Sequence, residues 1–372
     1  MLAGIITSKG GIARRIVDFC DALIGFVTGG LGAVAILASM FFGALTGSGM
    51  ATTSAIGGMM IPEMIEKNYS REYASTLVCF GGIVGPIIPP SISFVMYGTV
   101  ANVSISDLFI AGLLPGILIG LCLILTNYII CRKNHFGVKD VTYVDLPAGV
   151  YLRQRGKLVL KTFAEGFWAL LSPVIILGGI YSGVFSPTEA AAISVLYSIL
   201  ISFFVYRTIT LKDLYKAFAE AVVLNGITSF LLGYSTVFSA YLAYAKIPAM
   251  VNEFLQSVSD SRIVVLLLIN IFLLVLGCFL DTIPSITILA PILLPTAVAL
   301  GIDPIHFGVI MAVNLAIGLC TPPYGCNLFV GCAVGRVKME AMMRYIIPLL
   351  AAVIIALMII TFVPSISMFL VK

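Results

Sequence analysis

Long apolar segments separated by short polar turns make up most of the chain. A helix needs about 20 residues to cross the hydrocarbon core of a bilayer. Five segments reach or approach that length: residues 108–131, 167–181, 190–206, 218–244 and 345–370. The pattern therefore predicts an all-α polytopic membrane protein.

Two other apolar segments, residues 31–45 and 51–64, are too short to span a bilayer and are joined by a small polar turn at 46–50. Two short helices around such a turn are typical of a re-entrant hairpin, which enters and leaves the membrane on one side. The pattern recurs around a second turn, residues 281–285, with two further short arms: residues 263–280 and 286–300. We expect two re-entrant helical hairpins.

Each predicted hairpin is followed by an apolar segment that prolines interrupt. Residues 85–91 carry three prolines inside a segment, 73–100, that otherwise has the pattern of one membrane helix, and residues 321–325 interrupt a second segment in the same way. Proline removes an N–H donor and pushes the residue before it toward extended geometry. In a bilayer, broken backbone survives only inside protein or facing a wet cavity. The sequence therefore predicts two broken helices and a site near them.

The hairpin and the broken helix together form an internal repeat, with independent helix breaking as the alternative. A shift of 233 positions aligns five glycines and prolines of the first copy, Pro62, Gly85, Pro89, Pro90 and Gly98, with Pro295, Gly318, Pro322, Pro323 and Gly331.

Loop charges orient the two copies. The loop before the first broken helix carries Lys67 and Arg71, and the loop after it carries no Lys or Arg. In the second copy the order reverses, because Arg336 and Lys338 follow the broken helix. By the positive-inside rule the copies have opposite orientation, so the fold class is one of inverted repeats.

Residues 132–161 carry seven Lys or Arg against two Asp, so we expect this connector on the cytoplasmic side. Residues 153–168 and 214–221 have the pattern of interfacial helices that link fixed and moving parts, with a solvated loop as the alternative. The expected domains are an N-terminal scaffold or interfacial helix (1–30), transport repeat 1 (31–104), scaffold and arm helices (105–260), transport repeat 2 (261–335) and a C-terminal scaffold helix (336–372).

Composition removes several function classes. The chain has 372 residues, of which 60% are hydrophobic and 10% charged. Its net charge is only +4 and no basic cluster alternates with aromatic residues, so we expect no nucleic acid partner. The eight cysteines lack metal-ligand or CxxC spacing, and His135 and His306 are expected in loops. The sequence contains no nucleophile, zinc-binding or phosphate-loop motif, so we do not expect an enzyme.

The predicted geometry suits an anion and a hard cation. The second arm of each hairpin starts at the tip, so its positive helix end points toward the centre and favours a carboxylate. Uncapped carbonyls at the breaks, with Thr and Ser hydroxyls, form oxygen cages for Na⁺. One predicted cage combines Thr46, Ser48, Gly85, Ile88 and Pro90, and the other Asp281, Thr282, Gly318, Thr321 and Pro323.

The substrate contacts expected from this arrangement are Ser48, Thr52, Ser54, Ser91, Thr282 and Asn327. Several have a structural alternative. Thr52 and Ser54 sit where a side chain could cap or pack the second arm, and Asn327 could bond its neighbours instead of a substrate. Asp281 is the one acidic residue well inside an apolar region, which indicates function, with a helix N-cap as the alternative.

Four ordered runs carry a resemblance to a known family: residues 47–57, 85–91, 185–191 and 321–327. The chain resembles the large membrane (M) subunit of tripartite ATP-independent periplasmic (TRAP) transporters over nearly its whole length. The resemblance implies an elevator-type transporter of the ion-transporter superfamily, with Na⁺-coupled uptake of an organic acid such as a C4-dicarboxylate or a sialic acid.

The resemblance also implies partners and a location. These are a small membrane (Q) subunit, separate or fused, a periplasmic substrate-binding (P) protein, and membrane lipids, in the bacterial inner membrane. Family members usually begin with further membrane segments before the part that matches residues 1–15, so we expect the scaffold to be incomplete. Two other functions stay open: a stand-alone Na⁺/dicarboxylate or citrate carrier, and a channel or structural membrane subunit.

Overall fold

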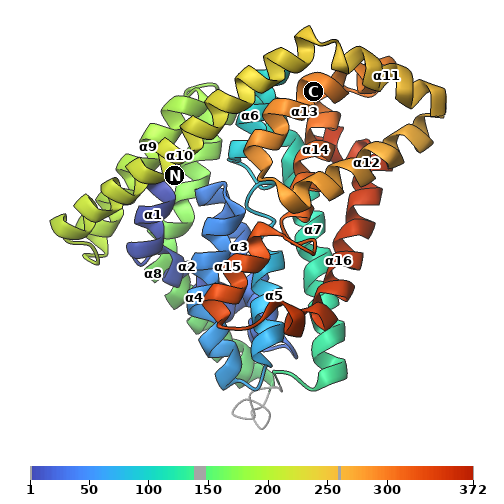
Figure 1. Ribbon diagram of the computed structural model, residues 1–372. Coiled ribbons are helices and arrows are strands. Elements are labelled where there is room, and N and C mark those ends of the chain that lie inside the picture. The colour runs from blue at the N-terminus through green and yellow to red at the C-terminus, as the bar shows by residue number, and fades with distance from the viewer. Residues whose placement is uncertain (1, 138–147, 259–260, 372) are drawn as a thin grey trace.

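The computed structural model describes residues 2–137, 148–258 and 261–371, and the described residues form helices joined by short turns (Figure 1). The first half contains α1 (Leu2–Lys9), α2 (Ile12–Ile24), α3 (Gly30–Thr46), α4 (Gly49–Glu66), α5 (Arg71–Gly82), α6 (Ile92–Ala101), α7 (Ile105–Asn134) and α8 (Ala148–Tyr181). The second half contains α9 (Pro187–Leu200), a π-helix η2 (Ile201–Val205), α10 (Leu211–Tyr244), α11 (Ile247–Val258), α12 (Arg262–Phe279), α13 (Thr282–Ala299), α14 (Pro304–Gly318), α15 (Cys326–Gly335), α16 (Met339–Phe362) and α17 (Ser365–Met368).

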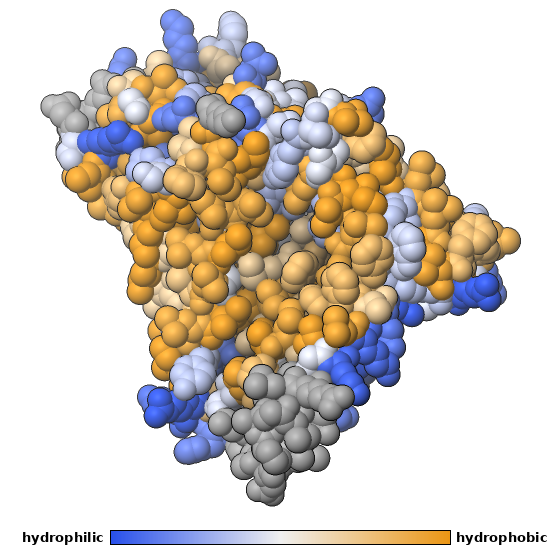
Figure 2. Space-filling model, turned by 180° about the vertical axis from the view of Figure 1, so that it is seen from behind, coloured by the Kyte–Doolittle hydropathy of each residue, from blue (hydrophilic) through white to orange (hydrophobic). Residues whose placement is uncertain are grey.

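The surface and the helix lengths are those of a multi-pass membrane protein. Within the described residues, seven helices are long and apolar enough to cross a membrane. Figure 2 shows a broad hydrophobic band across the middle of one face, with hydrophilic residues gathered toward its two ends. A band of this kind matches a bilayer core between two aqueous sides. The predicted all-α membrane class is confirmed.

Two pairs of consecutive helices stand where the hairpins were predicted, but α12 and α13 of the second pair are among the seven helices long enough to cross a membrane and are not short arms as expected. Helices α3 and α4 meet at Gly47 and Ser48, and α12 and α13 meet at Leu280 and Asp281. Figure 1 shows both helices of the first pair in its lower half and both helices of the second pair in its upper half. The second arm of hairpin 2 starts at Thr282, four residues earlier than predicted, because Pro284 stands in the first helical turn, where a missing N–H costs nothing.

The two predicted breaks are present as well. Helix α5 ends at Gly82 and α6 begins at Ile92, while α14 ends at Gly318 and α15 begins at Cys326. The prolines at 89–90 and at 322–323 are joined by cis peptide bonds. In Figure 1, α5 lies below α6 and α14 lies above α15, so the two broken helices run in opposite directions.

Two sets of helices can be traced through the packing, and they also contact each other through α2 on α3 and α10 on α13. Helix α7 packs against α3, α6, α14 and α16, and α16 packs against α5 and α14, so both belong with the hairpins and broken helices. Helices α1, α2, α8 and α9 pack on one another, and α10 packs on α1 as well as on α13 of the second hairpin. A small separate apolar cluster, with Ile6, Ile209 and Ala217 at its centre, joins α1, α9 and α10, whereas the buried residues of α2 and α8 belong to the main core.

Three local predictions are corrected. Residues 153–168 are not a separate interfacial helix, because α8 runs without a break from Ala148, and α10 runs from Leu211 through the whole predicted arm and span. His306 is not in a loop: it lies in the first turn of α14, buried, with its Nε2 3.3 Å from the Thr361 carbonyl oxygen. The middle of the basic connector, residues 138–147, lies outside the described residues.

Candidate functional site

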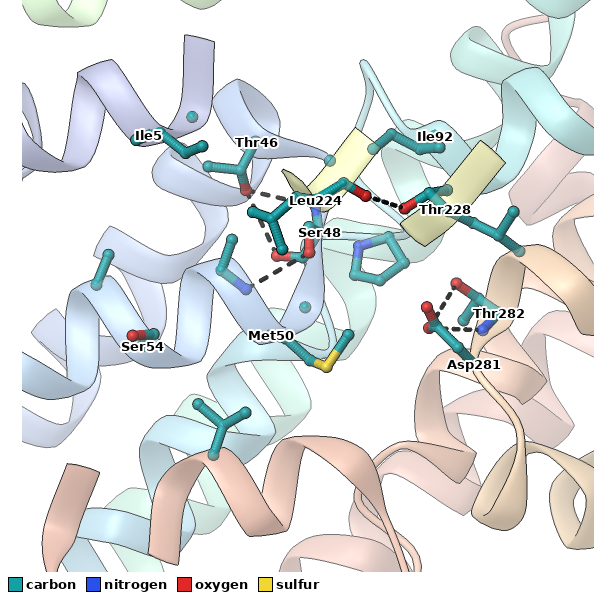
Figure 3. A pocket seen from close by; sticks show the side chains of 18 of the residues that line it. Ile5, Thr46, Ser48, Met50, Ser54, Ile92, Leu224, Thr228, Asp281 and Thr282 are labelled. Atoms are coloured by element: carbon teal, nitrogen blue, oxygen red, sulfur yellow. Dashed lines mark hydrogen bonds between the residues drawn. The ribbon is translucent and has the colours of Figure 1, made fainter. Parts of the chain in front are cut away.

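A cavity of about 560 Å³ lies where the two hairpin tips come closest to α1 and α10. One side is built by the first tip, from Thr46 to Ala51, and the other by Asp281, Thr282 and Ile283 at the second. Figure 3 shows Thr46 and Ser48 on one side of this space and Asp281 and Thr282 on the other, with Leu224 and Thr228 from α10 between the two sides in this view. The cavity therefore joins both halves of the chain at one place.

Two helix N-termini open into the cavity. Ser48 caps α4, its hydroxyl accepting a hydrogen bond from the Ala51 N–H, and Asp281 caps α13, its carboxylate accepting from the Thr282 N–H at 2.7 Å. The first-turn N–H groups of a helix have no carbonyl partner within that helix. Two positive helix ends that face one space favour an anionic ligand, and the Asp281 carboxylate offsets that charge at the second end.

The first tip and the first break are packed together by small residues. A Cβ placed on Gly85 would lie 2.9 Å from the Ser48 carbonyl oxygen, and a Cβ on Gly47 would lie 2.9 Å from the Pro90 carbonyl oxygen. The Thr46 and Thr52 hydroxyl oxygens are 3.1 Å apart, and Thr52 donates to the Ser48 carbonyl at 2.8 Å. Thr46, Ser48, Gly85 and Pro90 are thus brought to one location.

This cluster has the donor chemistry that a hard cation needs. The carbonyl oxygens of Gly85, Ile88 and Pro90 accept no hydrogen bond from any residue that the structure describes. The Thr52 hydroxyl oxygen would lie 3.1 Å from a Cβ placed on Gly85, and the Thr46 hydroxyl oxygen is 3.1 Å from that of Thr52. Because hard cations prefer oxygen ligands, this donor set is compatible with a hard cation.

The second break is more fully bonded to its hairpin. The Cys278 thiol donates to the Thr321 carbonyl at 3.0 Å, and the Gly325 N–H donates to the Cys278 carbonyl at 3.0 Å. The Gly318 carbonyl accepts from the Thr321 N–H at 2.9 Å. Asp281 and Thr282 line the cavity, whereas Gly318, Thr321 and Pro323 are not among the residues that line it.

The predicted substrate contacts separate into two sets. Ser48, Ser54 and Thr282 line the cavity. The other three, Thr52, Ser91 and Asn327, are buried and do not line it. Thr52 bonds the tip as described, and the Ser91 hydroxyl donates to the Pro86 carbonyl and caps α6. Asn327 lies beside Gly49, and its amide donates to the Cys79 carbonyl at 3.4 Å. Capping and packing therefore occupy the side chains of Thr52 and Ser91.

The structure adds residues that the sequence patterns did not indicate. Lys9 at the end of α1 and Glu220 on α10 both line the cavity and form an ion pair with each other. Together with Asp281, they are the charged residues in its lining, which leaves a formal excess of one negative charge. No local pattern marks Lys9 or Glu220, because their proximity depends on how α1 and α10 pack.

The fold and the cavity define a multi-pass helical membrane protein with an anion- and cation-compatible cavity between helix ends. Comparison with known families is specific: residues 1–366 match the model of the DctM component of tripartite ATP-independent periplasmic transporters. The chain belongs to this family, as the motifs at the tips and breaks predicted.

Three relatives show how far the similarity extends. The chain is 41% identical to the C4-dicarboxylate TRAP transporter large permease protein DctM of Pseudomonas aeruginosa, over 99% of this chain and 83% of the relative. It is 38% identical to the sialic acid TRAP transporter large permease protein SiaM of Vibrio cholerae, over 100% and 84%. It is 39% identical to the isethionate TRAP transporter permease protein DctMQ of Oleidesulfovibrio alaskensis, where it spans 99% of its own length and 56% of the relative.

Proposed function

We propose that this chain is the membrane subunit of a Na⁺-coupled secondary transporter that imports an organic acid delivered by a binding protein. The observation that carries the proposal is the cavity between the two tips, where two helix N-termini face one space. The three relatives are named for isethionate, C4-dicarboxylates and sialic acid, which are all organic anions. An acid of the same class fits the donors of the two tips.

Charge supports the coupling to Na⁺. The lining already carries an excess negative charge, so an anionic substrate that enters alone adds like charge to the cavity. A cation bound at the first tip and break offsets this repulsion. The oxygen cluster of Thr46, Ser48, Gly85 and Pro90 supports a site for that cation, and Asp281 with Thr282 supports a second at the other tip.

We propose an elevator mechanism in which the interfaces of α2 with α3 and of α10 with α13 are the surfaces between the moving and fixed bodies. We assign the hairpins and broken helices to the moving body, together with α7 and α16, which pack directly on them. This differs from the domain bounds expected from the sequence, which placed both helices in the scaffold. Helices α1, α2, α8, α9 and α10 form the fixed body. The opposite directions of the two broken helices (Figure 1) support inverted repeats that expose one site alternately to each side.

The partners follow from the family and from the relatives. The family is described as tripartite, and the DctMQ relative carries a longer chain than this one. We therefore propose a small membrane Q subunit and a periplasmic binding protein as partners, in the bacterial inner membrane.

Reconstituted uptake tests this proposal. Proteoliposomes containing the membrane subunits receive an inward Na⁺ gradient, the purified binding protein and a radiolabelled acid chosen from succinate, sialic acid and isethionate. We expect accumulation only when both the gradient and the binding protein are present. Accumulation without the binding protein would establish the stand-alone carrier instead. Flux that ignores the Na⁺ gradient would contradict the cation sites and favour a channel or structural subunit.

A further inference from the structure

Lys9 is the positively charged side chain in the lining of the cavity, and it comes from outside the repeats. It occupies the last turn of α1. Its ammonium group pairs with the Glu220 carboxylate of α10. Both side chains are about half exposed, at 45% and 48%, so the pair lies at the edge of the cavity rather than in the protein core.

The position of Lys9 is fixed by the packing of α1. Ile6 is fully buried against Ile209 and Ala217, which hold α1 on α10. The Thr208 hydroxyl donates to the Gly10 carbonyl at 2.6 Å, immediately after Lys9. Contacts on both sides of Lys9 therefore place the end of α1 beside the cavity.

We infer that Lys9 and Glu220 form an exchangeable pair, in which the acid group of the substrate replaces the Glu220 carboxylate on the Lys9 ammonium. This inference rests on the proposed anionic substrate and names the residue that selects it. A partly exposed pair is weak and costs little to open. The exchange replaces one carboxylate with another anion, so the ammonium group is never left without a counter-charge while the substrate binds or leaves.

The pair also explains how the cavity selects an acid although no arginine lies at the tips. The helix ends supply donors, but Asp281 opposes an anion. Lys9 supplies a full positive charge on the opposite body of the protein. An acid bound between a tip and Lys9 then contacts both the moving and the fixed groups of helices.

Two single variants test the exchange, because they break the same ion pair and have opposite predicted effects. Lys9→Gln removes the cation and weakens anion binding, whereas Glu220→Gln removes the competing carboxylate and strengthens it. We expect shifts of roughly three- to tenfold in the half-saturating anion concentration, in opposite directions. Lys216→Gln, one turn before Glu220 on α10 and absent from the cavity lining, is the matched control and leaves the value unchanged.

The measurement is thermal stabilisation of the purified membrane complex in NaCl by succinate, sialic acid and isethionate, with uncharged succinamide as the reference. Opposite shifts for the two variants support the exchange. Shifts in the same direction, no shift, or equal stabilisation of the wild type by succinamide would overturn it. Opposite shifts that are identical in NaCl and KCl would leave the exchange standing and contradict the Na⁺ coupling instead.

Discussion

Gly277 and Gly318 lie backbone against backbone, so that a Cβ placed on Gly318 would be 2.5 Å from the Gly277 Cα. The first glycine is on the first arm of hairpin 2, and the second is the last residue of α14 before the break. The other half contains a related contact, in which a Cβ on Gly43 would lie 2.8 Å from the Gly85 Cα. Each hairpin thus packs directly against the break of its own half. We expect the positions of the oxygen atoms at the tips and breaks to depend on this contact.

A methyl group at Gly318 tests this packing. Gly318→Ala forces the backbones of α12 and α14 apart, since the obstructing atoms are main-chain and cannot rotate away. We expect a loss of about 1–3 kcal/mol of stability, as for other overpacked sites, measured as a lower melting temperature of the purified chain. Gly226→Ala in α10 is the control: nothing lies within 4 Å of its added Cβ, and alanine favours a helix. Equal melting temperatures for the two variants would contradict the close contact.

A buried amide pair joins the same two helices. The Asn314 amide donates to the Asn270 side-chain oxygen at 2.6 Å, and both residues are buried. Asn314→Leu leaves the Asn270 amide oxygen with only a distant hydroxyl partner, Thr361 at 3.4 Å, so we expect a loss of about 1–3 kcal/mol. The double variant, with leucine at both positions, should lose less than the sum of the two single variants. Additive losses would show that the pair is not coupled.

Hydroxyls at the tip and the break are predicted to bind Na⁺. Ser48→Ala and Thr321→Val each remove one oxygen from a predicted cage, and we expect the half-saturating Na⁺ concentration for uptake to rise severalfold with little loss of expression. Thr99→Val is the control for threonine, because its hydroxyl bonds the carbonyl four residues earlier, as that of Thr321 does. Unchanged Na⁺ affinity in both variants would remove the side-chain assignments.

Ser48 also has a structural role, and a separate control variant distinguishes that role from Na⁺ binding. It caps α4, and loss of a serine cap costs about 0.5–2 kcal/mol. Ser104→Ala removes the equivalent cap of α7, away from the cavity. We expect both variants to lose stability and only Ser48→Ala to lose Na⁺ affinity. A matching loss of Na⁺ affinity in Ser104→Ala would assign the effect to helix capping alone.

Asp281 carries the excess negative charge of the cavity. Asp281→Asn removes the charge and keeps a side chain that caps helices equally well, so we expect stability to be retained. The half-saturating Na⁺ concentration should rise roughly tenfold, equivalent to about 1.4 kcal/mol. Asp303→Asn, at the cap of α14 and outside the cavity lining, is the charge-matched control. Equal Na⁺ affinity in the two variants would contradict a cation site at the second tip.

The sequence predicted the parts of this fold that local chemistry determines. The proline runs at 89–90 and 322–323 fixed the two breaks, and small polar turns located the tips at Ser48 and Asp281. The ends of helices were harder to predict. Charged residues mark where a membrane-spanning segment ends, but the helix itself can continue through them. Helix α8 continues back to Ala148 through Lys and Arg residues because these side chains are good helix formers.

The site was predicted only in part, for a related reason. Ser48, Ser54, Asp281 and Thr282 lie in local patterns at the two tips, and all four line the cavity. Lys9 and Glu220 are separated by more than half the chain and meet only because Ile6 packs on Ala217. Such a contact leaves no periodicity or motif in the sequence.

The dependence of anion binding on Na⁺ tests the central claim most directly. The half-saturating concentration of the anion that stabilises the complex, among succinate, sialic acid and isethionate, is measured in NaCl and in KCl at equal ionic strength. A shared site of Na⁺ and anion predicts a value about tenfold lower in NaCl, with an equal gain in Na⁺ affinity when the anion is present. The same value in both salts would contradict a Na⁺-coupled carboxylate site between the two tips.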